Sequence, residues 1–407
     1  MSSETDEAGV AASLKRAVGL ASLTLYGVGV TIGAGIYVLI GETAAQAGSL
    51  AALSFLIAAV VAGFTALSYC ELGARLPESA GEAAFVRAGL GSDRLAVGIG
   101  FAVMTTGVLS AATVLQGFAG YASSLVPAPG PVLILGALAV LLALTLWGVR
   151  EAVWAAAAVT FVEAAGLIWV IAIGAPTAIT APVAFEPAGV AGVFAAASIA
   201  FFAFIGFEDI VNMAEETHAP ERTLPRAILL TLAISTALYA GVVWVAAGVV
   251  PPGELAASAD PIAEVFRRLD APGVRVIALV ASLAVANGAL VQILMASRIL
   301  YGLSRRGLVF GAFSRVHAKR RTPHVATLTI ALVIAVLALV FPLAGLARAT
   351  SFVTLIVFAT VNLALLQLRR AGPPATGFRA PAWAPPLGLA ASLGLAIVAA
   401  VVFANGG

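Results

Sequence analysis

Two acidic side chains lie inside long apolar stretches of the sequence, where an ionised carboxylate is costly. Glu163 lies about 12 residues into one stretch, or roughly 18 Å from its end at 1.5 Å per residue, and Glu208 closely follows a glycine in another. A charge at the centre of a bilayer costs about 2.5–3.5 kcal/mol on insertion scales, so acids there pair, face a cavity or carry a proton. Both carboxyls are therefore candidates for carrying a proton or balancing a bound cation. For Glu163, a structural hydrogen bond to a neighbouring helix is an equally good interpretation.

Two glycine-containing stretches predict exposed backbone groups at a similar depth. One is Phe201–Asp209, and the other has four glycines within nine residues, namely Gly27, Gly29, Gly33 and Gly35. Each glycine inside a helix costs roughly 1 kcal/mol relative to alanine. Unwinding would free N–H groups that favour a carboxylate and carbonyls that accept from an ammonium group. A zwitterion such as an amino acid satisfies both sets. For the four glycines, close helix packing is the alternative interpretation.

The composition requires that these residues lie in a membrane protein. Of the 407 residues, 61% are hydrophobic and 10% are charged, whereas soluble domains carry about 25% charged residues. A helix needs about 20 apolar residues to span the hydrocarbon. The sequence predicts about eleven such spans, near 18–41, 50–72, 95–123, 131–149, 152–174, 190–215, 226–250, 274–300, 324–342, 347–368 and 384–404. Residues 256–269 predict a short amphipathic helix outside the bilayer. The expected fold class is an all-α integral membrane protein.

The distribution of basic residues orients the spans. With the N-terminus inside, eighteen of the 22 lysines and arginines fall in inside loops, as the positive-inside rule expects. Residues 1–17 are polar and acidic and lack the features of a signal peptide, so they predict a cytoplasmic tail. The protein is expected to be a multi-pass protein of the cell (inner) membrane with a cytoplasmic N-terminus. An odd number of spans would place the C-terminus outside.

The two glycine-containing stretches occupy matching positions. They lie in the first and sixth spans, near half the hydrocarbon depth, and these spans cross in opposite directions. Matched interruptions of this kind are typical of inverted repeats that form a transport site. We therefore predict an inverted five-plus-five repeat with broken helices 1 and 6. The ten-helix core covers residues 18–368, with repeats of about 18–174 and 190–368, and residues 384–404 form an additional transmembrane helix.

Other polar residues supply further candidates. Thr106 in the third span is placed to reach a ligand, and Ser282 and Asn287 in the eighth span are placed to complete a cation site. Hydrogen bonding between helices is the alternative for all three. The basic run Arg305, Arg306, Lys319, Arg320 and Arg321 is most simply a topology determinant, although binding of anionic lipid is a second interpretation.

Several functional classes are excluded by what the spans contain. They hold no nucleophile–base pair and no set of metal ligands, so the sequence does not predict an enzyme or a metal site. No nucleotide-binding loop is found, which argues against a primary pump on one chain. No cofactor and no nucleic-acid partner is expected.

The sequence resembles the amino acid–polyamine–organocation superfamily, most closely its cationic amino acid transporter-like branch. The resemblance is carried in order by Gly27–Val38, Ser68–Leu72 with Pro77–Glu82, Phe202–Glu208 with Glu215 and Glu216, and Ser297–Gly307. These motifs together cover the whole predicted transport core. The chain differs from many relatives in having eleven rather than twelve predicted spans. It also has Gly166 where many proton-coupled relatives place a lysine.

The resemblance implies specific substrate contacts. Residues of the first span would meet the substrate carboxylate, namely Thr31, Ile32, Gly33, Ala34 and Gly35. Carbonyls of Phe202, Ala203 and Ile205 would accept from its amino group. Phe204 or Phe207 would form an aromatic gate.

The residues and the resemblance together predict a secondary active transporter that moves amino acids by alternating access. Proton symport or exchange is the expected coupling, and no clear ligand cluster supports sodium. The alternatives are a membrane sensor that binds an amino acid without net transport, and a transporter of polyamines or other organocations. The lack of a specificity role for the buried acids favours neutral substrates, whereas the branch resemblance favours cationic ones.

Overall fold

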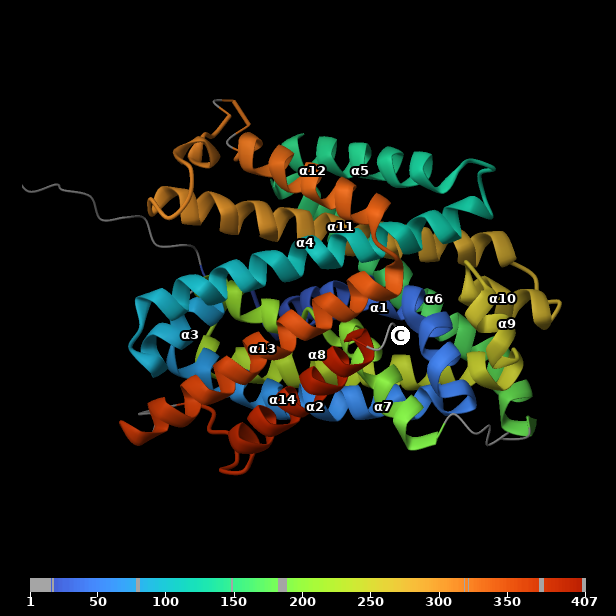
Figure 1. The fold of residues 1–407 in the computed structure, drawn as a ribbon, viewed down its shortest axis with the longest axis horizontal. Helices are drawn as coiled ribbons and strands as arrows, with labels where there is room; N and C mark the ends of the chain where they lie inside the picture. The colour runs from blue at the N-terminus through green and yellow to red at the C-terminus, as the bar shows by residue number, and fades with distance from the viewer. Residues whose placement is uncertain are drawn as a thin grey trace, which may run out of the picture.

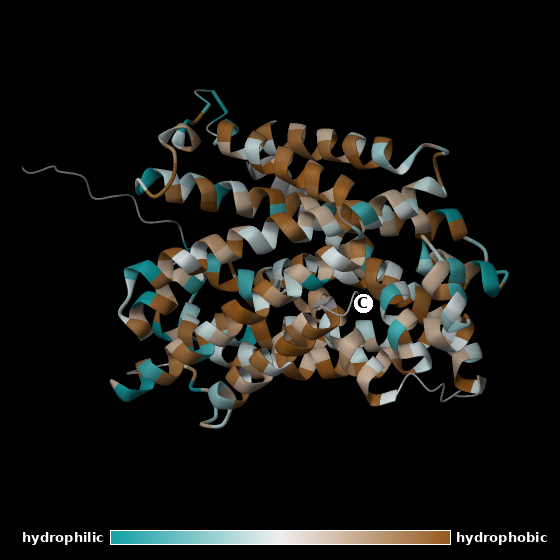
Figure 2. Ribbon diagram, viewed as in Figure 1, coloured by the Kyte–Doolittle hydropathy of each residue, from teal (hydrophilic) through white to brown (hydrophobic). Residues whose placement is uncertain are grey.

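The computed structural model describes residues 16, 18–77, 81–147, 149–181, 189–317, 319–320, 322–372 and 377–404, without the side chains of Ala34, 149–158 and 403–404. The predicted cytoplasmic tail therefore lies outside the described residues, apart from Arg16. The described chain has no β-strand, only one isolated bridge between Val18 and Thr217. The long helices run roughly side by side in Figure 1, with short elements at their ends, and apolar residues extend along them in Figure 2.

Eleven long helical segments correspond to the eleven predicted spans. They are α1 (Leu20–Ala47), α2 (Ala51–Arg75), α4 (Asp93–Ser123), α5 (Gly130–Trp147), α6 (Val149–Thr180), the segment Gly189–Glu216, α8 (Pro220–Val249), α11 (Val274–Arg305), α12 (His324–Val340), α13 (Leu343–Arg370) and α14 (Ala384–Ala404). By length and composition, nine segments of the described chain can cross a membrane. One of the nine joins the second half of α1 to α2 across the turn at Gly48, and α12 is slightly too short to be counted.

The short elements lie at the ends of the long helices. The amphipathic helix predicted at 256–269 is instead two helices, α9 (Pro252–Ala257) and α10 (Pro261–Arg268). They are separate because each begins with a proline, which lacks the N–H that would continue a preceding helix. At the opposite end of the molecule lies α3 (Gly81–Leu90), which the sequence did not predict as a helix. Two short 3₁₀ turns, η1 (Gly48–Leu50) and η4 (Gly311–Ser314), complete the connections.

The interruption predicted in the sixth span is confirmed. Helix α7 (Gly189–Ala200) is followed by the 3₁₀ turn η2 (Phe201–Phe204), an extended Ile205, and the 3₁₀ segment η3 (Phe207–Glu216). Gly206 between them has φ +127°, a conformation that residues with a Cβ rarely adopt. Ten residues of 3₁₀ helix are unusually many, and such stretches within a span mark hinges or strained sequences. The sixth span is therefore broken near its middle.

The interruption predicted in the first span is wrong, because α1 is a continuous helix from Leu20 to Ala47. Its glycines serve close packing instead, as the alternative interpretation proposed. A Cβ on Gly27 would lie 2.5 Å from the Ile210 side chain, and one on Gly33 would lie 3.1 Å from the Gly288 backbone nitrogen. Four glycines on α1 let η3, α6, α11 and η2 approach its backbone, and this packing offsets their low helix propensity.

Candidate functional site

The residues predicted to bind substrate on α1 and on the broken segment lie against each other. A Cβ on Gly35 would be 2.7 Å from the Ala203 Cα, and one on Gly206 would be 3.0 Å from the Thr31 nitrogen. The contact is therefore backbone against backbone. The predicted residues whose side chains are described are all buried there, namely Thr31, Ile32, Gly33, Gly35, Phe202, Ala203, Phe204, Ile205 and Phe207. The Ala34 side chain lies outside the described residues.

Hydrogen bonds fix both partners of this contact. Tyr239 donates from its hydroxyl to the Thr31 carbonyl at 2.7 Å, and Tyr121 donates to the Tyr37 carbonyl at 2.6 Å. The Phe202 carbonyl accepts from the Ile205 N–H at 3.2 Å. Phe204 packs edge-on against Tyr239, with 5.2 Å between ring centroids. The two predicted halves of the site are thus brought together, but in a closed arrangement.

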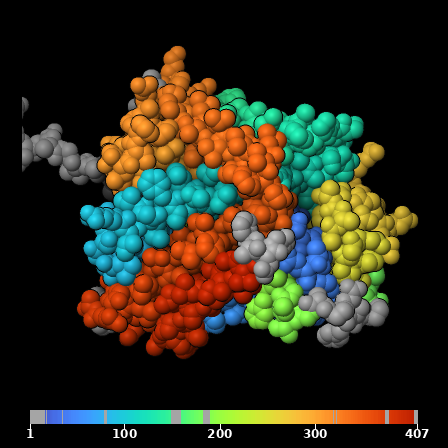
Figure 3. All heavy atoms as spheres, in the orientation of Figure 1, coloured from blue at the N-terminus to red at the C-terminus, as the bar shows by residue number. Residues whose placement is uncertain are grey.

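A large cavity, the vestibule, lies next to this contact. It has a volume of about 1300 Å³ and is lined mainly by α1, α3, α4, η3 and α11. Its lining on α11 runs from Asn287 to Leu303, about 24 Å of helix. It contacts Gly29 and Val30 of α1, which directly precede the predicted substrate residues. On the face seen in Figure 3, α4, α13 and α14 pack together and cover the inner helices.

A second, much smaller pocket adjoins the vestibule at the broken helix. It shares Glu82, Val103, Asp209 and Met295 with the vestibule, and it is also lined by Thr106, Ile205, Glu208, Gln292, Thr354, Val357 and Phe358. Its volume is about 20 Å³, which holds roughly one water molecule. Among the predicted substrate residues, only Ile205 lines either cavity. We call this space the side pocket.

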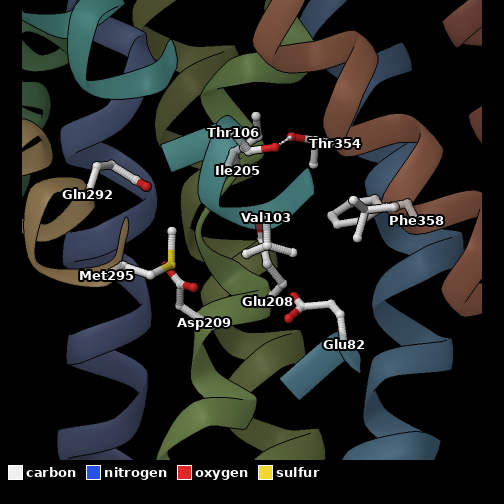
Figure 4. Close-up of a pocket in the computed structure, with 11 residues that line it drawn as sticks. Glu82, Val103, Thr106, Ile205, Glu208, Asp209, Gln292, Met295, Thr354 and Phe358 are labelled. Atoms are coloured by element: carbon white, nitrogen blue, oxygen red, sulfur yellow. Dashed lines mark hydrogen bonds between the residues drawn. The ribbon is translucent and has the colours of Figure 1, made fainter. Parts of the chain in front are cut away.

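Three carboxyls lie at one end of the side pocket, and the hydroxyls of Thr106 and Thr354 lie at the other, as Figure 4 shows. Glu208 accepts the Gly206 N–H at 2.8 Å, a bond that the break in the helix makes available. Glu82, from the first turn of α3, accepts from the Tyr69 hydroxyl at 3.2 Å. Burial raises the pKa of the Glu82 carboxyl above its ordinary value.

The polar groups that line the side pocket are mostly hydrogen-bond acceptors. The Gln292 Oε1 atom is buried and has no hydrogen-bond partner among the described residues. An unsatisfied buried acceptor costs about 1–3 kcal/mol, and the adjacent carboxylates offer it no proton when ionised. The described residues contain no cluster of acids, histidines and cysteines that could hold a metal ion. The carboxyls and the free Gln292 Oε1 acceptor can accept hydrogen bonds from an ammonium group, and the carboxyls can hold protons.

Glu163 and Asn287 form a second buried polar group. Asn287 donates from Nδ2 to Glu163 Oε1 at 2.8 Å, and Tyr37 donates to the Glu163 carbonyl at 2.8 Å. The other carboxyl oxygen of Glu163 has no hydrogen-bond partner in the described part of the chain. Asn287 also lines the vestibule. Glu163 is therefore connected to the vestibule through its hydrogen bond with Asn287. Two of the residues predicted to act in coupling, Glu163 and Asn287, are thus brought together.

Ser282 does not join them. Its hydroxyl donates to the Ala278 carbonyl at 2.8 Å within α11, and it lines neither cavity. Thr106, by contrast, lines the side pocket and accepts from the Thr354 hydroxyl at 3.4 Å.

At their end of the molecule, α9 and α10 pack against α1 and α4. A Cβ on Gly41 of α1 would lie 2.8 Å from the Leu255 carbonyl of α9. The Ile262 N–H donates to the Tyr121 hydroxyl at 3.4 Å, which ties α10 to α4. Arg267 binds both Asp260 and Glu264 within the same segment. The predicted topology assigns this end to the outside.

These features define the class of protein. Long apolar helices surround a helix broken near its middle, with a deep cavity beside the break and the short helices α9 and α10 packed against the bundle at one end. A multi-pass membrane protein built in this way is a transport protein. The chain belongs to the amino acid permease family, whose profile matches residues 18–407.

The individual relatives differ in what they are named for. The branched-chain amino acid permease BcaP of Bacillus subtilis is 33% identical over 386 residues, covering 89% of this chain and 82% of the relative. Cationic amino acid transporter 2 of Arabidopsis thaliana is 33% identical over 391 residues, covering 88% and 61%. The methylthioribose transporter of Bacillus subtilis is 29% identical over 394 residues, covering 91% and 85%. The chain spans less than two thirds of the length of the plant transporter. The family and these relatives are permeases and transporters, not enzymes.

Sequence reasoning missed most of the side pocket. Glu82 was noted only as part of a motif between two predicted spans. In the structure it is the second residue of α3, which begins at Gly81. Gln292 is an isolated amide within an apolar span, which is the signal that could have identified it. Met295, Thr354 and Phe358 carry no such signal, because apolar and hydroxyl residues are common between packed helices.

Proposed function

We propose that this protein is a secondary active transporter that moves amino acids across the cell membrane by alternating access. The proposal includes a cytoplasmic N-terminus, so that the vestibule opens to the cytoplasm and the α9–α10 end faces outside. The observation that carries it is the vestibule, which reaches from the inside helix ends to the broken helix and stops there. The names of the relatives support amino acids as the substrate class.

The side pocket is the proposed starting point of the substrate site. The substrate ammonium group would lie among Glu208, Asp209 and Gln292 Oε1, which together present charge and free acceptor capacity. Thr106 and Thr354 would limit the far end of the pocket. Since the pocket holds only about one water molecule, an amino acid enters only if the broken segment moves away from its neighbours.

The carboxylate is proposed to bind near Ile32–Gly35. In a continuous helix the N–H groups of these residues are bonded within α1. Binding therefore requires α1 to open locally, and its glycines are the positions where helix propensity opposes this least. Phe204 and Phe207 would close over the substrate. The two predicted repeats would exchange roles between the inward and outward states.

Protons are the proposed coupling ion, carried by Glu208 and Glu163. Glu208 lies at the break, where movement of Gly206 would remove a hydrogen bond from its carboxylate. Glu163 has one satisfied and one unsatisfied carboxyl oxygen beside a residue that lines the vestibule. A carboxyl in such a place binds and releases a proton according to what occupies the cavity.

Purified protein in liposomes tests the transport function. Counterflow of a labelled amino acid, screened over the twenty standard amino acids, is the expected result. Binding without flux would support the sensor alternative, and flux of polyamines without flux of amino acids would support the organocation alternative.

The coupling residues are tested by the pH profile of uptake. Glu163→Gln should flatten the dependence of uptake on an imposed pH gradient while counterflow persists, because exchange at equal pH needs no net proton movement. Glu208→Gln should flatten the same dependence and also weaken counterflow, because Glu208 is proposed to contact the substrate ammonium group as well. The hydroxyl variant Ser282→Ala is the matched control and should keep the wild-type profile. An unchanged profile in Glu208→Gln removes that residue from coupling.

A further inference from the structure

The charge of the chain is distributed unequally between its two halves. No aspartate or glutamate follows Asp270, whereas twelve of the 22 lysines and arginines do. The loop between α11 and α12 contributes the exposed side chains of Arg306, Arg315, Lys319 and Arg320. In the part of the chain that the structure describes, no carboxylate forms a salt bridge with any of these four.

The loop has a defined shape. Ser304 donates from its hydroxyl to the Phe310 carbonyl at 2.8 Å, and the His317 N–H donates to the Thr322 carbonyl at 2.9 Å. The Arg320 backbone N–H donates to His317 Nδ1 at 3.2 Å. The described part of the loop around Arg320 is therefore folded before any ligand arrives, which lowers the entropy that binding must overcome.

Arg320 connects the loop to the end of α5. Its guanidinium lies 5.5 Å from the centre of the Trp147 ring and donates to the Trp147 carbonyl at 3.4 Å. Neither contact neutralises its charge. Trp147 is 59% exposed. Exposed tryptophan side chains next to cations are typical of the part of a membrane protein that lies at the level of the lipid headgroups. Phe310, in the same loop, is 82% exposed.

The position of the loop indicates which kind of ligand it can bind. In Figure 1 it lies at the edge of the bundle, beyond α5 and α12, and Figure 3 shows it protruding at the same edge. The helices next to the loop, α5 and α12, expose aliphatic side chains such as Val140, Leu328 and Leu332. A ligand that reaches both surfaces must carry an anionic group attached to apolar chains. We propose that Arg315, Lys319 and Arg320 of the α11–α12 loop, together with Trp147, bind the headgroup of an anionic phospholipid at the inner surface of the membrane, an orientation that rests on the proposed function.

The proposal is tested by lipid binding to the delipidated, detergent-solubilised full-length protein. Labelled phosphatidylglycerol is titrated with unlabelled phosphatidylglycerol, phosphatidylcholine or inorganic phosphate as competitor. Only phosphatidylglycerol should compete effectively. The double variant Lys319→Gln, Arg320→Gln should bind roughly 25-fold more weakly, at about fivefold for each cation near the surface.

Two further variants make the test specific. Arg94→Gln with Arg379→Gln removes two exposed cations from other inside loops and should leave binding unchanged. Arg320→Lys keeps the charge but loses the planar group over Trp147, so it should show a smaller loss than the double variant. Equal competition by phosphatidylcholine, equal competition by inorganic phosphate, or unchanged binding in the double variant would each overturn the proposal. Gel filtration of every variant checks that it is folded.

Discussion

Replacing Gly206 by alanine tests whether the break in the sixth span depends on glycine. The residue has φ +127° and ψ −24°, outside the regions that residues with a Cβ occupy readily. The added methyl group would lie 3.0 Å from both the Thr31 nitrogen and the Val30 carbonyl carbon. These are backbone atoms of a continuous helix, so neither can rotate away as the end of a side chain would.

The expected cost combines two effects. A residue held in a sparsely populated backbone region costs about 1–3 kcal/mol, and inserting a methyl group into a packed site costs about 1–3 kcal/mol. Gly206→Ala should therefore destabilise the folded structure by about 2–6 kcal/mol. Gly136→Ala in α5 is the matched control, because nothing lies within 4 Å of its added methyl group. That control should gain up to roughly 1 kcal/mol of helix propensity.

The two variants are compared in detergent and in liposomes. Gly206→Ala should lower the apparent melting temperature and reduce amino acid counterflow, while Gly136→Ala should do neither. If Gly206→Ala melts at the wild-type temperature, the left-handed backbone at this residue is not needed, and the account of the break is refuted.

Two other substitutions probe the groups around the site. Burial raises the pKa of the Glu82 carboxyl in the folded protein. Between the ordinary carboxyl pKa and the raised one, the folded protein keeps a proton that the unfolded chain has lost. The free energy of unfolding therefore falls as pH rises through this window. Glu82→Gln should therefore raise the melting temperature above that window and leave it unchanged below it; a pH-independent difference would contradict this. Glu71 binds Arg369, Arg75 and the Ala380 N–H from a fully buried position, so Glu71→Gln should destabilise by about 3–5 kcal/mol, measured as loss of melting temperature. Wild-type stability in that variant would mean that the two arginines find other partners.

The helix pattern was predictable because a span leaves a simple signal. Some twenty apolar residues bounded by charges or turns define a crossing helix without reference to the rest of the chain. The break at Gly206 was predictable for a related reason, since Glu208 and Asp209 follow the glycine within an apolar run. Helix α3 was missed because its ten residues are too short and too mixed in polarity to give that signal.

The state of α1 could not be predicted from its glycines. A glycine permits unwinding and close packing equally, and what decides between them lies far away in the sequence. Gly33 lies against Gly288, and the Thr31 carbonyl accepts from Tyr239. None of these partners can be identified from the local sequence of α1. The same reason explains why the side pocket, formed by segments up to 276 residues apart between Glu82 and Phe358, was only partly foreseen.

The two glycine-containing spans therefore contribute differently to one mechanism. The sixth span is already broken, and its Gly206 and Ala203 lie against the backbone of α1 at Thr31 and Gly35. Because both surfaces are backbone, no change of side-chain rotamer can create space between them. Room for a substrate must come from separating the two segments or from opening α1 itself. Either movement exposes unpaired backbone groups, which are costly inside a membrane unless a ligand satisfies them. A zwitterion that enters from the vestibule would satisfy these backbone groups. Substrate binding and the conformational change would then occur together.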